Sequence, residues 1–403
     1  MNIEIKKIQQ AIISTKKKIA VILIIAAIII LCLFLIIGKG TIPYLSENGV
    51  FYYKIEGKDA KLFSLGSGNE PKYLTTMPAE EINPDDYRVP KHSYVSESGD
   101  ILIYFERTEE IPLGTIGEND EYTAYRIIYQ PKYIDLKSKT VKEIEQDIDS
   151  GSLVFSSKED KIAWVLLAQE STVGELEQAG VQREVWISNS DGTNAKQLAV
   201  LDDKVVLLQR WEDDYIYFWG IKGVGYYTLG RINVKSGKVQ YIRPKYCLEN
   251  LTNCQNFSFS PSGKLFIYEA GFNQQNNDNL EIFAESFTGS ESWKILVANY
   301  VSDRVWMPDN NSIIYTEQVT EKKLGVREKI HLANLETGED TEIYTGSYIS
   351  QINSDTSGKY LYFIEKETDE KFNLVKLNIK SGKTEIIDSG EYYHLRLFSY
   401  DSI

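Results

Sequence analysis

Three adjacent aspartate pairs are the residues of this chain whose type and spacing come nearest to catalytic chemistry. They are Asp85-Asp86, Asp202-Asp203 and Asp213-Asp214. Glycoside hydrolysis needs two carboxyl groups on opposite sides of a sugar. Adjacent residues of a strand point to opposite faces, and acids in turns are usually solvated. We therefore interpret these pairs as surface residues.

Metal and cofactor chemistry has little support in the sequence. The three histidines, His92, His331 and His394, are far apart, and none has a cysteine or glutamate at ligand spacing. His331 alternates within a predicted strand and is interpreted as structural. The acidic turn beginning at Asp309 lacks the spacing of a calcium loop. No phosphate loop and no Gly-x-Ser-x-Gly elbow occurs. We expect no metal, no cofactor and no catalytic residue.

The elements that must position any site begin with a basic tail and an apolar segment. Residues 1–18 carry five lysines, and the nineteen residues Ile19 to Ile37 carry no charge. As a helix this segment is roughly 28 Å long, close to the thickness of a hydrocarbon core. A cleaved signal peptide would have a shorter apolar region and small residues before the cut. We predict a cytoplasmic tail at 1–18, a transmembrane helix at 19–38 and an extracytoplasmic domain at 41–403, held at the plasma membrane with the N-terminus inside.

Two cysteines would then lie outside the membrane. Cys247 and Cys254 are seven positions apart in one predicted linker, residues 244–256. An oxidising compartment permits a disulfide that clasps this loop. Two free thiols are the alternative, and the sequence leaves both open.

The exported part repeats one plan about every fifty residues. Its clearest copy is Phe257-Ser-Phe-Ser-Pro-Ser-Gly-Lys-Leu-Phe-Ile-Tyr268, and the copies close on aromatic residues spaced 51, 60, 53, 51, 47 and 47 positions apart. These aromatics are Tyr53, Tyr104, Trp164, Tyr217, Tyr268, Tyr315 and Tyr362. Each unit reads as four short antiparallel strands, with glycine in the tight turn after the third, as at Gly237, Gly338 and Gly382. A repeat of this length and content predicts an all-β propeller.

The repeat resembles that of TolB-like propellers, which is similar in turn to the WD40-like N-terminal propeller of dipeptidyl-peptidase-IV-like enzymes. The resemblance covers nearly all of residues 41–403, and only Phe257 to Tyr268 matches cleanly. The units at Trp211 and Val305 lack the Ser-Pro-Ser-Gly core. The resemblance implies that the motif is structural, and it carries no catalytic residue onto this chain.

The two ends of the domain predict how the ring closes. The first unit has good second, third and fourth strands but a poor first strand, whereas Tyr392 to Asp401 reads as a first strand without a unit. We predict that this C-terminal strand completes the N-terminal blade, which gives seven blades and no open sheet edge.

Insertions between the second and third strands predict a face of long loops. They lie at 107–123, 169–182, 271–279 and 317–328, together with the linkers 80–88 and 244–256. Long loops on a rigid scaffold commonly carry binding. The net charge of −14 combines +5 in the first forty residues with −19 in the remainder. So acidic a domain is a poor ligand for nucleic acid, whose phosphates need lysine and arginine.

These features predict a non-enzymatic binding or scaffold module for a protein or cell-envelope ligand. The alternative is an enzyme that processes glycan or peptide at the central channel, with Asp213 or Asp309 as candidate acids. Burial and raised pKa values would distinguish catalytic acids from solvated ones.

Overall fold

In the computed structural model, every described residue lies within the unit Ile42–Ile403. The described residues are 50–398 except 66–69, 84–85, 89–92, 97–98, 117–121, 147, 149–151, 168–182, 224–225, 245–246, 248–253, 271–279, 290–291, 299–300, 322–324 and 392–394. The predicted tail and transmembrane segment, 1–18 and 19–38, lie outside this range. Within it, no helix is long and apolar enough to cross a membrane.

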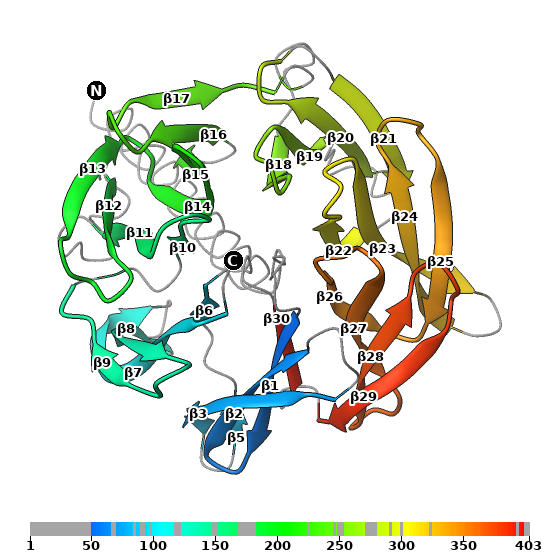
Figure 1. Ribbon diagram of the computed structural model, residues 1–403, viewed down its shortest axis with the longest axis horizontal. Helices are drawn as coiled ribbons and strands as arrows, with labels where there is room; N and C mark the ends of the chain where they lie inside the picture. The colour runs from blue at the N-terminus through cyan, green and yellow to red at the C-terminus, as the bar shows by residue number, and fades with distance from the viewer. Residues whose placement is uncertain are drawn as a thin grey trace, which may run out of the picture. The chain divides into compact units, whose positions relative to one another are not determined.

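The described residues form seven four-stranded antiparallel sheets arranged as the blades of a propeller (Figure 1). We number the blades 1 to 7 along the chain. Blade 1 contains β30 (Leu395–Phe398), β1 (Val50–Glu56), β2 (Asp59–Leu65) and β3 (Lys72–Pro78). Blade 2 contains β6 (Ser93–Val95), β7 (Ile101–Ile116), β8 (Tyr122–Asp135) and β9 (Val141–Glu143). Blade 3 contains β10 (Leu153–Phe155), β11 (Lys161–Leu167), β12 (Arg183–Asn189) and β13 (Lys196–Leu201).

The remaining four blades repeat the same order from the inside outward. They contain β14 (Val205–Glu212), β15 (Tyr215–Gly223), β16 (Tyr226–Asn233) and β17 (Val239–Ile242); β18 (Cys254–Phe259), β19 (Leu265–Ala270), β20 (Leu280–Ser286) and β21 (Ser292–Ala298); β22 (Val301–Trp306), β23 (Ser312–Glu321), β24 (Gly325–Asn334) and β25 (Asp340–Gly346); and β26 (Ile349–Ser354), β27 (Tyr360–Lys366), β28 (Phe372–Asn378) and β29 (Thr384–Gly390). A small hairpin, β4 (Glu80–Asn83) with β5 (Asp86–Arg88), links blades 1 and 2. The prediction of an all-β fold with seven blades is confirmed.

The C-terminal strand closes blade 1, as the sequence predicts. Strand β30 pairs antiparallel with β1, and Phe398 lies opposite Phe51. Leu395 and Leu397 are both buried against residues of blade 7 and blade 1. Across the same seam, Lys54 forms an ion pair with Asp388 at 2.6 Å. Closure therefore joins both ends of the domain within one sheet.

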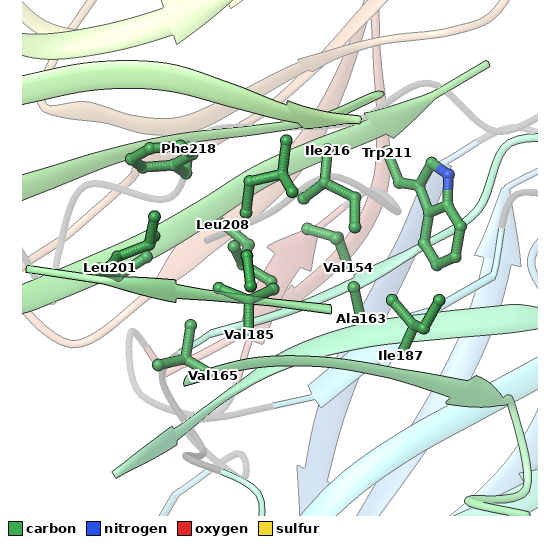
Figure 2. Packing of buried hydrophobic residues seen from close by; sticks show 13 residues of the cluster. Val154, Ala163, Val165, Val185, Ile187, Leu201, Leu208, Trp211, Ile216 and Phe218 are labelled. Atoms are coloured by element: carbon green, nitrogen blue, oxygen red, sulfur yellow. The ribbon is translucent and has the colours of Figure 1, made fainter. Parts of the chain in front are cut away.

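Hydrophobic contacts between neighbouring blades form the core. The seven aromatics that close the repeats lie on the second strand of each blade, and all are buried. Figure 2 shows the contact between blades 3 and 4, where Val154 and Ala163 face Leu208 and Ile216. Each blade packs only on its neighbours, so the apolar area buried between neighbouring blades is the main stabilising term of this repeat fold.

The Ser-Pro-Ser-Gly turn contributes to this packing between blades. Gly263 has a φ of +65°, and its Cα faces the Tyr217 ring of blade 4. In blade 6, whose unit lacks the motif, Asn310 takes the position of the glycine with a φ of +63°. Asparagine adopts this conformation more readily than other residues with a Cβ. Its Oδ1 also accepts a hydrogen bond from the Ser262 amide of blade 5 at 2.6 Å.

The turn after the third strand shows a second departure from the repeat. In three blades an asparagine is followed four positions later by a glycine of positive φ, namely Gly237, Gly338 and Gly382. In blade 2 the same place is taken by Lys139, with a φ of +62° and its amide bonded to the Asp135 carbonyl at 2.8 Å. Blade 2 therefore keeps the turn with a residue that disfavours this φ.

We expect Lys139→Gly to stabilise the protein. Removing the Cβ relieves a strain of about 1 kcal/mol, and the greater freedom of glycine in the unfolded chain leaves a net gain of roughly 0.5 kcal/mol. Urea unfolding followed by tryptophan fluorescence measures the change. Lys139→Ala is the matched control, since it keeps the Cβ. An equal gain from alanine would contradict the explanation.

Candidate functional site

Two of the predicted long loops are extended strands. Within the insertion at 107–123, β7 continues to Ile116 and β8 begins at Tyr122, and within the one at 317–328, β23 continues to Glu321 and β24 begins at Gly325. The prediction of loops at these two places is therefore corrected. The insertions at 169–182 and 271–279 lie outside the described residues. The polar residues of these two insertions are compatible with a hairpin as well as with a loop, so the sequence did not distinguish the two structures.

The β7–β8 extension projects furthest beyond its own sheet. Strand β6 pairs with β7 only at residues 102–104, and β9 pairs with β8 only at residues 132–134. The pairing between β7 and β8 continues to Ile116 opposite Tyr122. Among the described residues, this two-stranded ribbon has no further strand beside it over most of its length. We call the segments 109–116 and 122–128 the β7–β8 ribbon.

The aspartates considered from sequence are placed apart from one another. Asp213 is exposed, has a φ of +51° and forms an ion pair with Lys158. Asp309 is exposed and caps its own turn, accepting hydrogen bonds from the amides of Asn311 and Ser312 at 2.9 Å. These arrangements are typical of solvated turn acids.

The other two pairs are placed differently. Asp203 is fully buried and accepts a hydrogen bond from the Tyr241 hydroxyl at 3.0 Å, whereas Asp202 is exposed. Asp86 begins β5, and Asp85 lies outside the described residues. Asp203 therefore holds β17 in its blade rather than facing a partner acid.

The single described histidine lies on the third strand of blade 6. His331 stacks on Tyr315 with ring centroids 4.9 Å apart, and Asp340 lies 3.3 Å from its Nδ1. Tyr315 also donates a hydrogen bond to Asp340 at 2.6 Å. His92 and His394 lie outside the described residues. No group of three metal-ligating side chains occurs in the part of the chain that the structure describes.

The linker cysteines are joined in the structure. A disulfide connects Cys247 and Cys254, whose Cα atoms are 6.1 Å apart. We expect the protein isolated without reductant to show no free thiol at these two positions. Alkylation and peptide mass spectrometry measure this, with a reduced sample as the control. Two alkylated cysteines in the unreduced sample would contradict it.

Two carboxyl groups that the sequence did not single out, half-buried Asp303 and buried Glu328, lie between blades 6 and 7. Asp303 lies at an irregularity of β22, and its Oδ2 accepts a hydrogen bond from the Gln351 amide at 2.6 Å. Glu328, on β24, is 3% exposed and accepts a hydrogen bond from the Ile349 amide. Both carboxylates therefore bind the backbone of β26.

The same burial changes the acidity of both groups. Desolvation raises the pKa of Asp303 to about 6. Desolvation, with a further contribution from the Asp303 charge, raises the pKa of Glu328 to about 7. A third carboxyl group nearby, Glu365, pairs through its strand with Ile349 and also has a pKa raised by burial. Among the described acids, these three have a pKa raised by desolvation, and of the three Glu328 is the one that is fully buried.

These pKa values predict that stability falls as the pH rises. Because the folded pKa values of Asp303 and Glu328 lie above their unfolded values, the native state holds protons that the unfolded chain releases. The stabilisation is complete below about pH 4 and lost as the pH rises to about 7. At pH 8 we expect D303N/E328Q to be more stable than the parent chain by about 2 kcal/mol, with little difference near pH 4.

Thermal unfolding at the two pH values tests this prediction. Asp214→Asn is the control, because that acid pairs with Lys235 on the surface. If the double variant kept the full pH dependence of the parent chain, other groups would be responsible.

A chain of hydrogen bonds connects these residues to the neighbouring blades. Arg304 donates to the Asn256 carbonyl of blade 5 and to Glu269 at 2.7 Å. Gln351 accepts from the Leu397 amide of β30 at 2.8 Å. Residues at the irregular positions of β18, β22 and β26 therefore connect the innermost strands of neighbouring blades by hydrogen bonds. Such contacts give the β-bulges at these positions a structural role.

Comparison with known proteins identifies the fold. No protein-family model and no curated protein sequence matches the chain. Among solved structures, a prolyl endopeptidase is similar with a TM-score of 0.57 at 10% identity, over 89% of this chain and 50% of that one. An oligogalacturonate lyase from Vibrio parahaemolyticus is similar with a TM-score of 0.50 at 11% identity, over 81% and 88% of the two chains.

The propeller family that the repeat resembles is also found, at lower similarity. TolB from Acinetobacter baumannii has a TM-score of 0.38 at 13% identity, over 71% of this chain and 68% of that one. This chain spans about half the length of the endopeptidase. At these identities the likeness shows the fold alone. The chain has the β-propeller fold, which both binding proteins and enzymes use.

Proposed function

We propose that this protein is a membrane-anchored, extracytoplasmic propeller that acts as a non-enzymatic binding module for a protein or cell-envelope ligand. The observation that carries the proposal is the β7–β8 ribbon, which extends past both strands beside it. An isolated two-stranded ribbon is marginally stable in water. Its extension beyond the blade is therefore best explained by a ligand that covers it.

Anchoring at the plasma membrane is supported by the sequence. The nineteen uncharged residues from Ile19 to Ile37 follow five lysines, and one lysine, Lys39, lies close after them. This bias places the N-terminus in the cytoplasm and the propeller outside. The distance between the anchor and the propeller then sets how far from the membrane a ligand is held.

Crosslinking of the intact chain in its own cells tests the proposal. The variant to compare replaces residues 108–128 with Asn-Gly, a two-residue turn between Arg107 and Tyr129, which lie opposite each other. We call it the short-ribbon variant. We expect the parent chain to crosslink reproducibly to one partner or envelope polymer, and the short-ribbon variant to lose it.

A matched control shortens a different hairpin. Replacing residues 320–326 with Asn-Gly joins Val319 to Arg327, which are also opposite each other. This variant should retain the partner. Equal capture by the parent and the short-ribbon variant, with both folded by circular dichroism, would refute the assignment of binding to this face.

A hydrolytic or lyase activity on glycan or peptide is the second candidate. It is favoured by Asp303 and Glu328, whose pKa values are raised toward neutrality by burial. If the protein cleaves a glycan or peptide library, both D303N and E328Q should reduce the rate at least a hundredfold, whereas Asp309→Asn should not. Cleavage that persists in both variants would exclude this pair as the acid and base.

A further inference from the structure

Three buried polar atoms lie on one strand beside the seam at which the ring closes. Ser350 and Asn353 belong to β26, the innermost strand of blade 7, and are 9% and 1% exposed. Within the part of the chain that the structure describes, Ser350 Oγ, Asn353 Nδ2 and Asn353 Oδ1 have no hydrogen-bond partner. A buried polar atom without a partner loses its hydration and gains nothing in return, so such atoms are rare in native proteins. Three of them in one place indicate a ligand.

The pairing of β26 with β27 shows which way these side chains point. Ser350 lies opposite Ile364, and Asn353 lies opposite Tyr362. Residues directly opposite each other in an antiparallel pair share a face of the sheet. Ile364 and Tyr362 belong to the hydrophobic cluster shared by blades 7 and 1, so both polar side chains point toward blade 1. The two positions opposite them are two residues apart, which separates the Cα atoms of Ser350 and Asn353 by about 7 Å.

The closing strand offers main-chain groups in the same seam. Strand β30 pairs with β1 along one edge, and the Leu397 amide donates to Gln351 Oε1 of β26 at 2.8 Å. In an antiparallel strand the amide and carbonyl of a residue point the same way, and the residue two positions along repeats that direction. The carbonyl groups of Leu395 and Leu397 therefore point away from β1, on the side of β26.

Two other blades show that this position does not require an amide. At the same register of their hairpins, blade 5 has Ser258 and blade 6 has Val305. In the described structure the Ser258 hydroxyl is also buried without a partner, whereas Val305 packs in an apolar cluster. A seam of this propeller can therefore form with an apolar residue here, and the polar pair is a feature of the closing seam.

The chemistry of the three atoms selects their ligand. An asparagine amide has donors on its nitrogen and an acceptor on its oxygen, so in either orientation one atom needs an acceptor and the other a donor. A metal ion would satisfy only the oxygen, and an anion only the nitrogen. Water both donates and accepts, and a buried water commonly makes about three hydrogen bonds. The Ser350 hydroxyl and a carbonyl of β30 complete such a set.

We infer that a buried water molecule occupies the seam between blades 7 and 1, where Asn353 and Ser350 bind it and it joins β26 to the closing strand β30. The water supplies hydrogen bonds at the edge of β30 that faces away from β1. This site does not depend on the proposed binding function.

A high-resolution crystal structure of the full chain in detergent tests the site directly. We expect one density peak within hydrogen-bond distance of both Asn353 and Ser350. A seam without such density would overturn the inference. A peak with the anomalous signal of a metal ion would overturn it as well.

Urea unfolding of the full chain tests the same site in solution. Asn353→Leu keeps the size of the side chain but leaves the water and Ser350 without their partner, so the unfolding equilibrium constant should rise about tenfold. Ser350→Ala should raise it about threefold. The double variant should cost no more than Asn353→Leu alone, because both residues act through one water.

Ser354→Ala is the matched control. Ser354 lies on the same strand, but it is opposite Leu361 of the cluster between blades 6 and 7. Its replacement should change the unfolding constant by less than about twofold.

Two results of the unfolding experiment would overturn the inference. A lower unfolding constant for Asn353→Leu would show that the amide is unpaired in the native state, since removal of an unpaired buried group stabilises a protein. Additive losses in the double variant would show that the two residues do not share a water. If Asn353→Leu fails to fold, the crystal structure of the parent chain decides.

Discussion

Replacing Gly263 with alanine should cost about 3 kcal/mol of folding free energy. A methyl group at this position would lie 2.5 Å from Cζ and 2.6 Å from Oη of the Tyr217 ring. That ring is 5% exposed and already packs against Phe259 and Phe287 of blade 5, with ring centroids 4.9 and 5.6 Å away. The ring cannot move without disturbing the contact between blades 4 and 5. The positive φ of Gly263 adds a backbone strain of about 1 kcal/mol.

Gly382→Ala separates the two causes. Gly382 has a φ of +67°, but no atom lies within 4 Å of the position that a Cβ would take. The substitution should therefore cost only the strain of about 1 kcal/mol. Urea unfolding of both variants measures the difference. Equal losses of folding free energy in the two variants would show that the contact with Tyr217 adds nothing to the cost of Gly263→Ala.

Placing a charge on the closing strand should have the largest effect on stability. Leu397 is 1% exposed and packs in the cluster shared by blades 7 and 1. Leu397→Asp removes its apolar contacts and buries a carboxylate without a partner, so we expect a loss of at least about 4 kcal/mol. Opening of blade 1 would also expose the edge of β1, and we expect aggregation on heating.

Ile386→Asp is the control for this prediction. Ile386 lies on β29 of blade 7 and is 60% exposed, so a charge there should change stability by less than about 0.5 kcal/mol. Calorimetry of the full chain measures both. A folded Leu397→Asp variant with an unchanged melting temperature would show that β30 does not hold the ring closed.

Much of the fold follows from local rules that the sequence displays. The turn glycines repeat because the turn after the third strand needs a positive φ in the blades where it is described, and Gly237, Gly338 and Gly382 all have it. The last strand could be predicted because Leu397 and Phe398 repeat the apolar pattern of a first strand, although the other strands of a blade do not accompany them. The weak match at Val305 is also explained, since Asn310 replaces the glycine of its turn. In each case a short segment carries the information.

The candidate site follows from contacts that no short segment displays. The pKa values of Asp303 and Glu328 are raised because both groups are desolvated against β26, and the residues of β26 that they bind lie 48 positions from Asp303 and 21 from Glu328 along the chain. Asp213 and Asp309 are aspartates like Asp303, but both side chains are exposed. Burial is a property of how blades meet, and hydrophobic periodicity reports only which face of a strand turns inward. The length of the β7–β8 ribbon was missed for a related reason, because its polar residues are compatible with a loop.

The pairing of the two chain ends within blade 1 also sets the order of events during synthesis. Tyr52 and its partner Asp388 are 336 residues apart, so β1 emerges long before the strand that completes its sheet. At about 5–20 residues per second, a ribosome needs on the order of 20–80 s to make the whole chain. Until β30 is made, the N-terminal blade lacks the strand that completes its sheet, and the edge of β1 is open. A chain released before β30 is made would keep that edge open.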